Sequence, residues 1–162
     1  NQGLYAVAIG ETAGNTSQGL YGVAVGQEAG SNIQGYGAVA VGSSAGYDTQ
    51  GAFSVAVGLN AGQTTQGSTA VALGYNAGLT SQGQSAVAIG YFAGYTNQAT
   101  NSIILNATGA QLNQTTANTF TVKPVRAVTS VTFAAPTAGS IPAGFSPMYY
   151  NPTTGEIIVI TT

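Results

Sequence analysis

Side chains capable of acid–base or nucleophilic chemistry are few in this sequence. It has no histidine and no cysteine, and its charged residues are Lys123, Arg126, Glu11, Glu28, Asp48 and Glu156. The commonest general base, the thiol nucleophile and the usual transition-metal ligands are therefore missing. Ser130 and Ser146 have no partner base near them other than Lys123. We therefore expect no enzyme, no metal site and no cofactor.

The few charged residues also argue against other kinds of site. Glu11, Glu28 and Asp48 fall at different phases of a 16-residue repeat, so they do not form the paired carboxylates of a glycosidase. One aspartate cannot supply the repeated ligands of a calcium-binding solenoid. Two basic residues make no patch for nucleic acid or an anionic membrane surface. No apolar run is long enough for membrane insertion.

The repeat that organises the chain is the stretch Val7–Gly10. Its copies follow with a 16-residue period and no insertion, at Val23, Val39, Val55, Val71 and Val87, and a degenerate seventh copy is Ile103–Asn106. A fixed period of this length is typical of a solenoid. The sequence predicts an all-β fold, with a parallel β-roll (β-solenoid) of seven 16-residue repeats over residues 1–115.

Each copy alternates bulky and small residues with the period of a strand. We expect Val7 and Ile9 to fill the interior of the coil and the small side to pack against neighbouring chains. So thin a roll buries too little apolar surface to be stable alone, which predicts a homo-oligomer. The predicted interface residues are Ala8, Ala24, Ala40, Ala56, Ala72 and Ala88.

Two further columns predict local structure. A glycine follows each strand from Gly10 to Gly90 and indicates a tight corner, because glycine tolerates left-handed backbone conformations. Glutamine recurs at one fixed position of every repeat from Gln2 to Gln114. Stacked coils place such amides about 4.8 Å apart. We therefore interpret the column as a structural hydrogen-bonded ladder.

The period stops near Thr115, and residues 116–162 read as a small C-terminal β-rich cap or connector. Residues 119–133 alternate as a strand does, and residues 134–147 are rich in proline, glycine and alanine. Residues 148–160 have a strand, turn, strand pattern that predicts a hairpin. The chain begins at Asn1 with no secretion signal, and we expect it to be a piece of a longer protein.

These motifs resemble those of two groups of known proteins. The Val-Ala-Ile-Gly strands with small residues before them resemble the head repeats of trimeric autotransporter adhesins. That resemblance implies a homotrimer of parallel β-rolls with the small face at the interface. The segments 74–78, 101–107 and 149–157 are similar to fibre-like proteins of phages and large algal viruses, and this match covers nearly the whole chain.

The resemblances imply an attachment fibre on a virion or an extracellular surface, acting as a rigid trimeric shaft or head. Its partners would be copies of itself and a cell-surface glycan or protein receptor. The densest group of outward aromatics, the predicted surface contact, is Tyr75, Tyr91, Phe92 and Tyr95. A purely structural shaft, with recognition elsewhere, is one alternative. Another is an ice-binding solenoid built on Thr16, Thr64, Thr80 and Thr96, although Asn32 and Asp48 interrupt that column.

Overall fold

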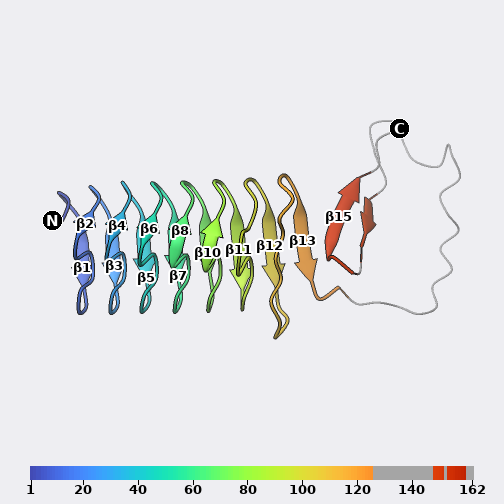
Figure 1. Ribbon diagram of the computed structural model, residues 1–162, viewed down its shortest axis with the longest axis horizontal. Helices are drawn as coiled ribbons and strands as arrows, with labels where there is room; N and C mark the ends of the chain where they lie inside the picture. Colours follow the sequence, from blue (N-terminus) through green and yellow to red (C-terminus); the bar gives the residue numbers. More distant parts are fainter. Residues whose placement is uncertain (126–147, 152, 160–162) are drawn as a thin grey trace, which may run out of the picture.

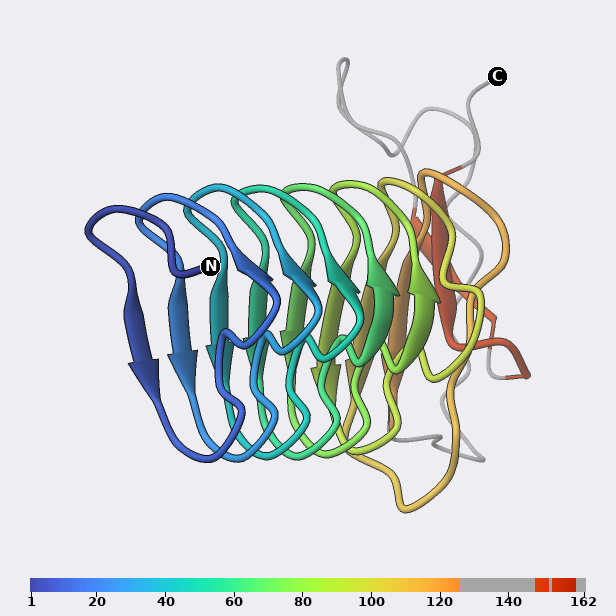
Figure 2. The same cartoon turned by 60° about the vertical axis from the view of Figure 1, so that its left-hand side comes forward.

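The chain folds into a stack of parallel coils (Figures 1 and 2), and each of the first five coils has two short strands joined by two corners. The computed structural model describes residues 1–125, 148–151 and 153–159. Within those ranges every regular element is a β-strand. The all-β solenoid predicted from the repeat period is confirmed.

The larger sheet, sheet A, has ten strands and runs the length of the molecule. Its repeated strands pair in parallel and in register from one repeat to the next, so that Val7 lies beside Val23 and Val23 beside Val39. The strands in spatial order are β1 (Val7–Ile9), β3 (Val23–Val25), β5 (Val39–Val41), β7 (Val55–Val57), β9 (Val71–Leu73), β11 (Val87–Gly90), β12 (Ile103–Asn106), β13 (Phe120–Lys123), β15 (Glu156–Val159) and β14 (Met148–Tyr150).

The smaller sheet, sheet B, forms the opposite wall of the first coils. All of its pairings are parallel, as Gln18 beside Gln34 illustrates. Its five strands are β2 (Ser17–Gln18), β4 (Ile33–Gln34), β6 (Thr49–Gln50), β8 (Thr64–Gln66) and β10 (Thr80–Gln82). The interior of the solenoid lies between the two sheets.

The side chains of the sheet A strands point the opposite way from the prediction, with the alanines inside the coil and the valines outside. The alanines Ala24, Ala40, Ala56, Ala72 and Ala88 are fully buried within a single chain, in one apolar core with the alanines of the following corner. Ala8 belongs to the same column, but in the first coil it stays exposed. The valines and isoleucines point outward. The proposed alanine interface is therefore wrong, because the buried alanine side chains are inside the coil.

The reason is that glutamine side chains fill the space between the sheets. Gln50 is 1 % exposed, and its Nε2 donates to Val39 O of sheet A at 2.7 Å. A Cβ added to Gly46 would lie 2.7 Å from Gln50 Oε1. With an amide spanning the interior, only alanine or glycine fits against it, and a valine side chain has no room.

The predicted glutamine ladder is present, with breaks. Nε2 of Gln34, Gln66 and Gln82 donates to Oε1 of the glutamine one coil later at 3.1 Å. Oε1 of Gln18, Gln34 and Gln66 is buried without a partner among the described residues. Each Nε2 from Gln18 to Gln98 also bonds a sheet A carbonyl, so the column ties the two walls together.

The glycine corners are confirmed at the repeated position. Gly42 has a φ of +129°, and a Cβ there would lie 2.6 Å from Gly58 O of the next coil. Backbone conformation and close stacking therefore both require glycine. In the degenerate copy Asn106 instead ends β12, and its side chain donates to Tyr91 O and Ala110 O at 2.7 and 2.8 Å.

The seventh coil is wider than the others. Ile104, fully buried, occupies the alanine position, and Leu112 takes the place of the second interior alanine. Ala93 forms an isolated parallel β-bridge with Leu112, whereas the regular 16-residue period would place Gly109 beside Ala93. The loop between β12 and Leu112 is accordingly longer, and it protrudes below β12 (Figure 1). The seventh coil thus has both larger core side chains and a longer loop than the regular coils.

Sheet A continues through the predicted boundary at residues 115/116. β13 pairs in parallel with β12, and β15 then pairs with β13 in the antiparallel sense. β14 and β15 form the predicted hairpin, with Tyr150 beside Ile157. The predicted strand continuation to residue 133 and the irregular connection at residues 134–147 lie, from residue 126 on, outside the described residues.

Candidate interaction surfaces

The outer side of sheet A carries two columns of apolar side chains. Every residue of both columns is half-buried or exposed in the single chain. The parallel pairing of β1 through β13 sets both columns in register. One column is Val7, Val23, Val39, Val55, Val71, Val87, Ile103 and Phe120, and the other is Ile9, Val25, Val41, Val57, Leu73, Ile89, Leu105 and Val122. We call these columns the apolar face.

The apolar face contains no charged or polar side chain along either column. Parallel sheets in proteins are almost always covered on both faces. Here the alanine side is covered by the coil's own core, whereas the valine side is covered by nothing in the described part of the chain. Exposed apolar strips of this kind are typical of surfaces that contact a partner.

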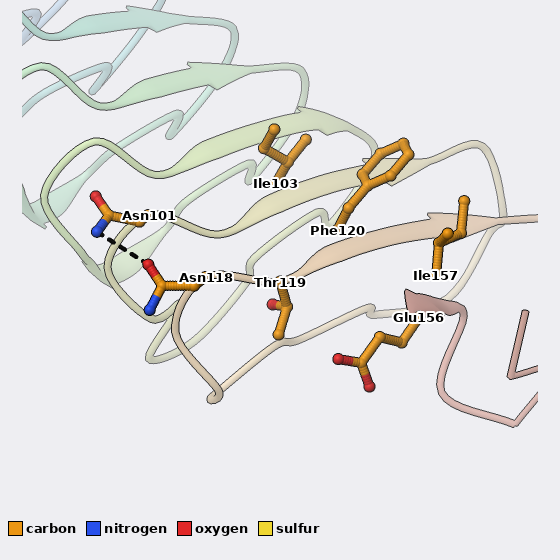
Figure 3. Close-up of a pocket in the computed structure, with 7 residues that line it drawn as sticks. All are labelled: Asn101, Ile103, Asn118, Thr119, Phe120, Glu156 and Ile157. Carbon is orange, nitrogen blue, oxygen red and sulfur yellow. Dashed lines mark hydrogen bonds between the residues drawn. The ribbon is translucent and has the colours of Figure 1, made fainter. Parts of the chain in front are cut away.

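Each apolar column adjoins a hollow near its C-terminal end. A hollow of about 560 Å³ lies beside β12, β13 and β15 (Figure 3). Ile103, Phe120 and Ile157 project to the same side of these strands, and Asn101 Nδ2 donates to Asn118 Oδ1 at 3.2 Å. Thr119 and Glu156 complete the lining. The lining is therefore mixed, with apolar side chains on one side and polar side chains, among them one ionisable group, on the other.

A second hollow, of about 390 Å³, adjoins the other column. Its lining is mostly apolar and includes Ile89, Leu105, Val122, Lys123 and Pro124. The two hollows thus lie along the two columns near the C-terminal end of the apolar face, and they belong to that surface.

The predicted aromatic contact residues do come together. Tyr75 and Tyr91 stack at 5.3 Å between ring centroids, and Phe92 packs edge-on to both at 5.5 and 4.3 Å. Tyr95 lies 4.9 Å from Phe92. We call these four residues the ring patch. It occupies the corner that follows β9 and β11.

Sequence reasoning missed a second aromatic column, at the corner that precedes the first four sheet A strands. Tyr5 stacks on Tyr21 at 5.4 Å, and Tyr36 and Phe53 continue the column edge-on at 5.6 and 5.2 Å. The signal was present, because these residues recur at nearly one phase of the repeat. Tyr36 is one position out of phase, which concealed the column.

The acidic side chains take part only in local contacts. Asn32 Nδ2 donates to Asp48 Oδ1 at 3.1 Å, and Ser44 Oγ donates to Glu28 Oε2 at 3.0 Å. Within the described part of the chain, histidine, cysteine, aspartate and glutamate nowhere gather in a group of three that could hold a metal ion. The described residues also contain no helix long and apolar enough to cross a membrane.

No family model, curated protein or solved structure matches this chain. The sequence predicted the residues of the ring patch, but the alanine side of the strand that it assigned to an interface is buried inside the coil.

Proposed function

We propose that this chain is a structural module of an attachment fibre on a virion or cell surface, assembled as a homotrimer through the apolar face. The observation that carries the proposal is the pair of uncharged apolar columns on the outer side of a parallel sheet. An association that covers them removes branched side chains from water at about 25 cal/mol per Å².

A second copy of the chain is the occupant that fits the face best. Its own face is flat, uncharged and apolar, and it repeats with the same rise of about 4.8 Å per coil. Side chains of one copy can therefore fall between those of another at every coil. The trimeric state is the one implied by the resemblance to trimeric autotransporter adhesin heads.

The ice-binding alternative has weaker support. It needs a long flat column of threonines, and the column in question holds only three in succession, Thr64, Thr80 and Thr96. Asn32 and Asp48 precede them and bond to each other. We therefore favour the fibre module.

The mass in solution tests the proposal. Light scattering on the whole chain is expected to give three times the 16.0 kDa of one chain. Val41→Lys places a charge in the apolar face and should yield monomers that retain the β spectrum. Ile33→Lys is the matched control, since Ile33 is 52 % exposed on sheet B, and it should stay trimeric. A monodisperse wild-type monomer would refute the proposed assembly.

A further inference from the structure

The ring patch combines apolar ring surface with hydrogen-bonding groups that the chain does not use. Tyr75 and Tyr91 are 41 % and 45 % exposed. Among the described residues, the hydroxyls of Tyr75, Tyr91 and Tyr95 take part in no hydrogen bond, whereas Tyr150 uses its hydroxyl to bond Val122 O. Tyrosine side chains of this kind present an apolar body and a polar tip to a partner.

Asn76 adds an unused donor beside the patch. Its side chain is 7 % exposed, and its Oδ1 accepts from Asn60 Nδ2 at 3.0 Å. No acceptor in the described part of the chain takes a hydrogen bond from Asn76 Nδ2, which is not among the fully covered polar atoms. The asparagine ladder would continue at the next coil, but Phe92 occupies that position.

Phe92 is the only aromatic residue at its corner position in the six regular coils. Its φ is +53°, and the same corner position in the preceding coils is held by Thr12, Glu28, Ser44, Asn60 and Asn76. Asparagine tolerates this left-handed region far better than a bulky aromatic residue does. Because every regular coil has this left-handed corner, what distinguishes the sixth coil is its aromatic side chain rather than its backbone.

The surroundings of the patch are uncharged and lie to one side of the apolar face. Glu11, Glu28 and Asp48 all belong to the first three coils, whereas the patch lies on the fifth and sixth. The patch runs from Tyr91, directly after β11, to Tyr95, which precedes the Thr96 bridge to Thr80 of sheet B. Its far end is therefore turned away from the apolar face.

From these contacts we infer that the ring patch is a binding site for a neutral glycan, an inference that rests on the proposed attachment function. The C–H face of a hexopyranose packs on the exposed ring surface of Tyr91 and Phe92. Its hydroxyl groups bond the free tyrosine hydroxyls and Asn76 Nδ2. With no cation in the patch, carboxylated or sulfated sugars gain nothing there.

The first experiment applies the whole chain to an array of neutral hexopyranose oligosaccharides that also carries sialylated and sulfated glycans. Neutral glycans are expected to bind, and Tyr91→Ala to weaken that binding at least tenfold. Tyr21→Ala is the matched control, since Tyr21 is 48 % exposed and stacked on Tyr5, and it should bind as wild type does. The inference is overturned if no neutral glycan binds or if the acidic glycans bind better. It is also overturned if Tyr21→Ala loses as much neutral-glycan binding as Tyr91→Ala does.

A second variant separates binding from folding. Phe92→Asn relieves the left-handed strain and extends the Asn60–Asn76 ladder, so its melting temperature should equal or exceed that of wild type. Its neutral-glycan binding should fall at least fivefold, and full retention of binding contradicts the site. Light scattering on the same samples keeps the two proposals apart. A trimer that binds no glycan refutes only the glycan site, whereas a monomer that binds neutral glycan refutes only the assembly.

Discussion

Gln50 shows at the scale of one residue how a thin solenoid holds its two walls apart. Its amide donates to Val39 O and accepts from Gln34 Nε2 at 3.1 Å. Both contacts lie in the interior, where a missing hydrogen-bond partner is costly. The glutamine column therefore takes the place that a layer of large apolar side chains has in thicker folds.

Gln50→Ala should destabilise the fold through this column. It removes the buried hydrogen bond from Gln34 and the part-buried one to Val39 O, and it leaves a cavity, so we expect the free energy of unfolding to fall by about 1–3 kcal/mol. Chemical denaturation measures the change. Gln84→Ala is the control, because Gln84 is exposed and its loss should change stability by less than about 0.5 kcal/mol. If the two substitutions lowered the free energy of unfolding equally, the interior amide of Gln50 would contribute no more to stability than an exposed glutamine does.

At this scale the sequence was informative. The fixed phase of Gln18 through Gln98 predicted a ladder, and the glycines after each strand predicted left-handed corners; both are present. The breaks in the ladder were not predictable, since they depend on the torsion angles of individual amides. The change of role at Asn106 was not predictable either, because asparagine also tolerates a left-handed corner.

At the scale of the element, the strand Val39–Val41 explains why the facing was misjudged. Alternation with period two shows that Val39 and Ala40 point to opposite sides, but not which side is inside. Both sides are apolar, so hydropathy does not decide. Constancy between repeats does not decide either, because the outward Val39 and its equivalents are as invariant in the six regular copies as the buried Ala40 and its equivalents.

Ala40→Leu tests the corrected facing directly. Ala40 is 0 % exposed between the two sheets, so a leucine there overpacks the interior and should lower the free energy of unfolding by about 1–3 kcal/mol or more. Val41→Leu, on the adjacent outward position, should change it by less than about 1 kcal/mol. Thermal melts at one protein concentration compare them. If Ala40→Leu instead kept wild-type stability and lost only self-association, the original alanine interface would be right.

At the scale of the whole molecule, the repeat length predicted the stack but not its C-terminal features. An unbroken series of equal spacings is enough to specify parallel coils. The wider seventh coil depends on Ile104 packing with Leu112 across a spacing that breaks the period. The antiparallel pairing of β15 with β13 joins residues far apart in the sequence, and no local pattern encodes such a contact.

The proposed assembly predicts that stability depends on protein concentration. If three chains fold and associate together through the apolar face, a hundredfold rise in concentration should stabilise each chain by on the order of 2 kcal/mol. For a chain of this size that raises the melting temperature by roughly 5 °C. Differential scanning calorimetry over that concentration range measures the shift. Val41→Lys should melt lower and at a temperature independent of concentration, while Ile33→Lys should follow wild type. A concentration-independent wild-type melting temperature would mean that the apolar face contributes nothing to the stability of the fold.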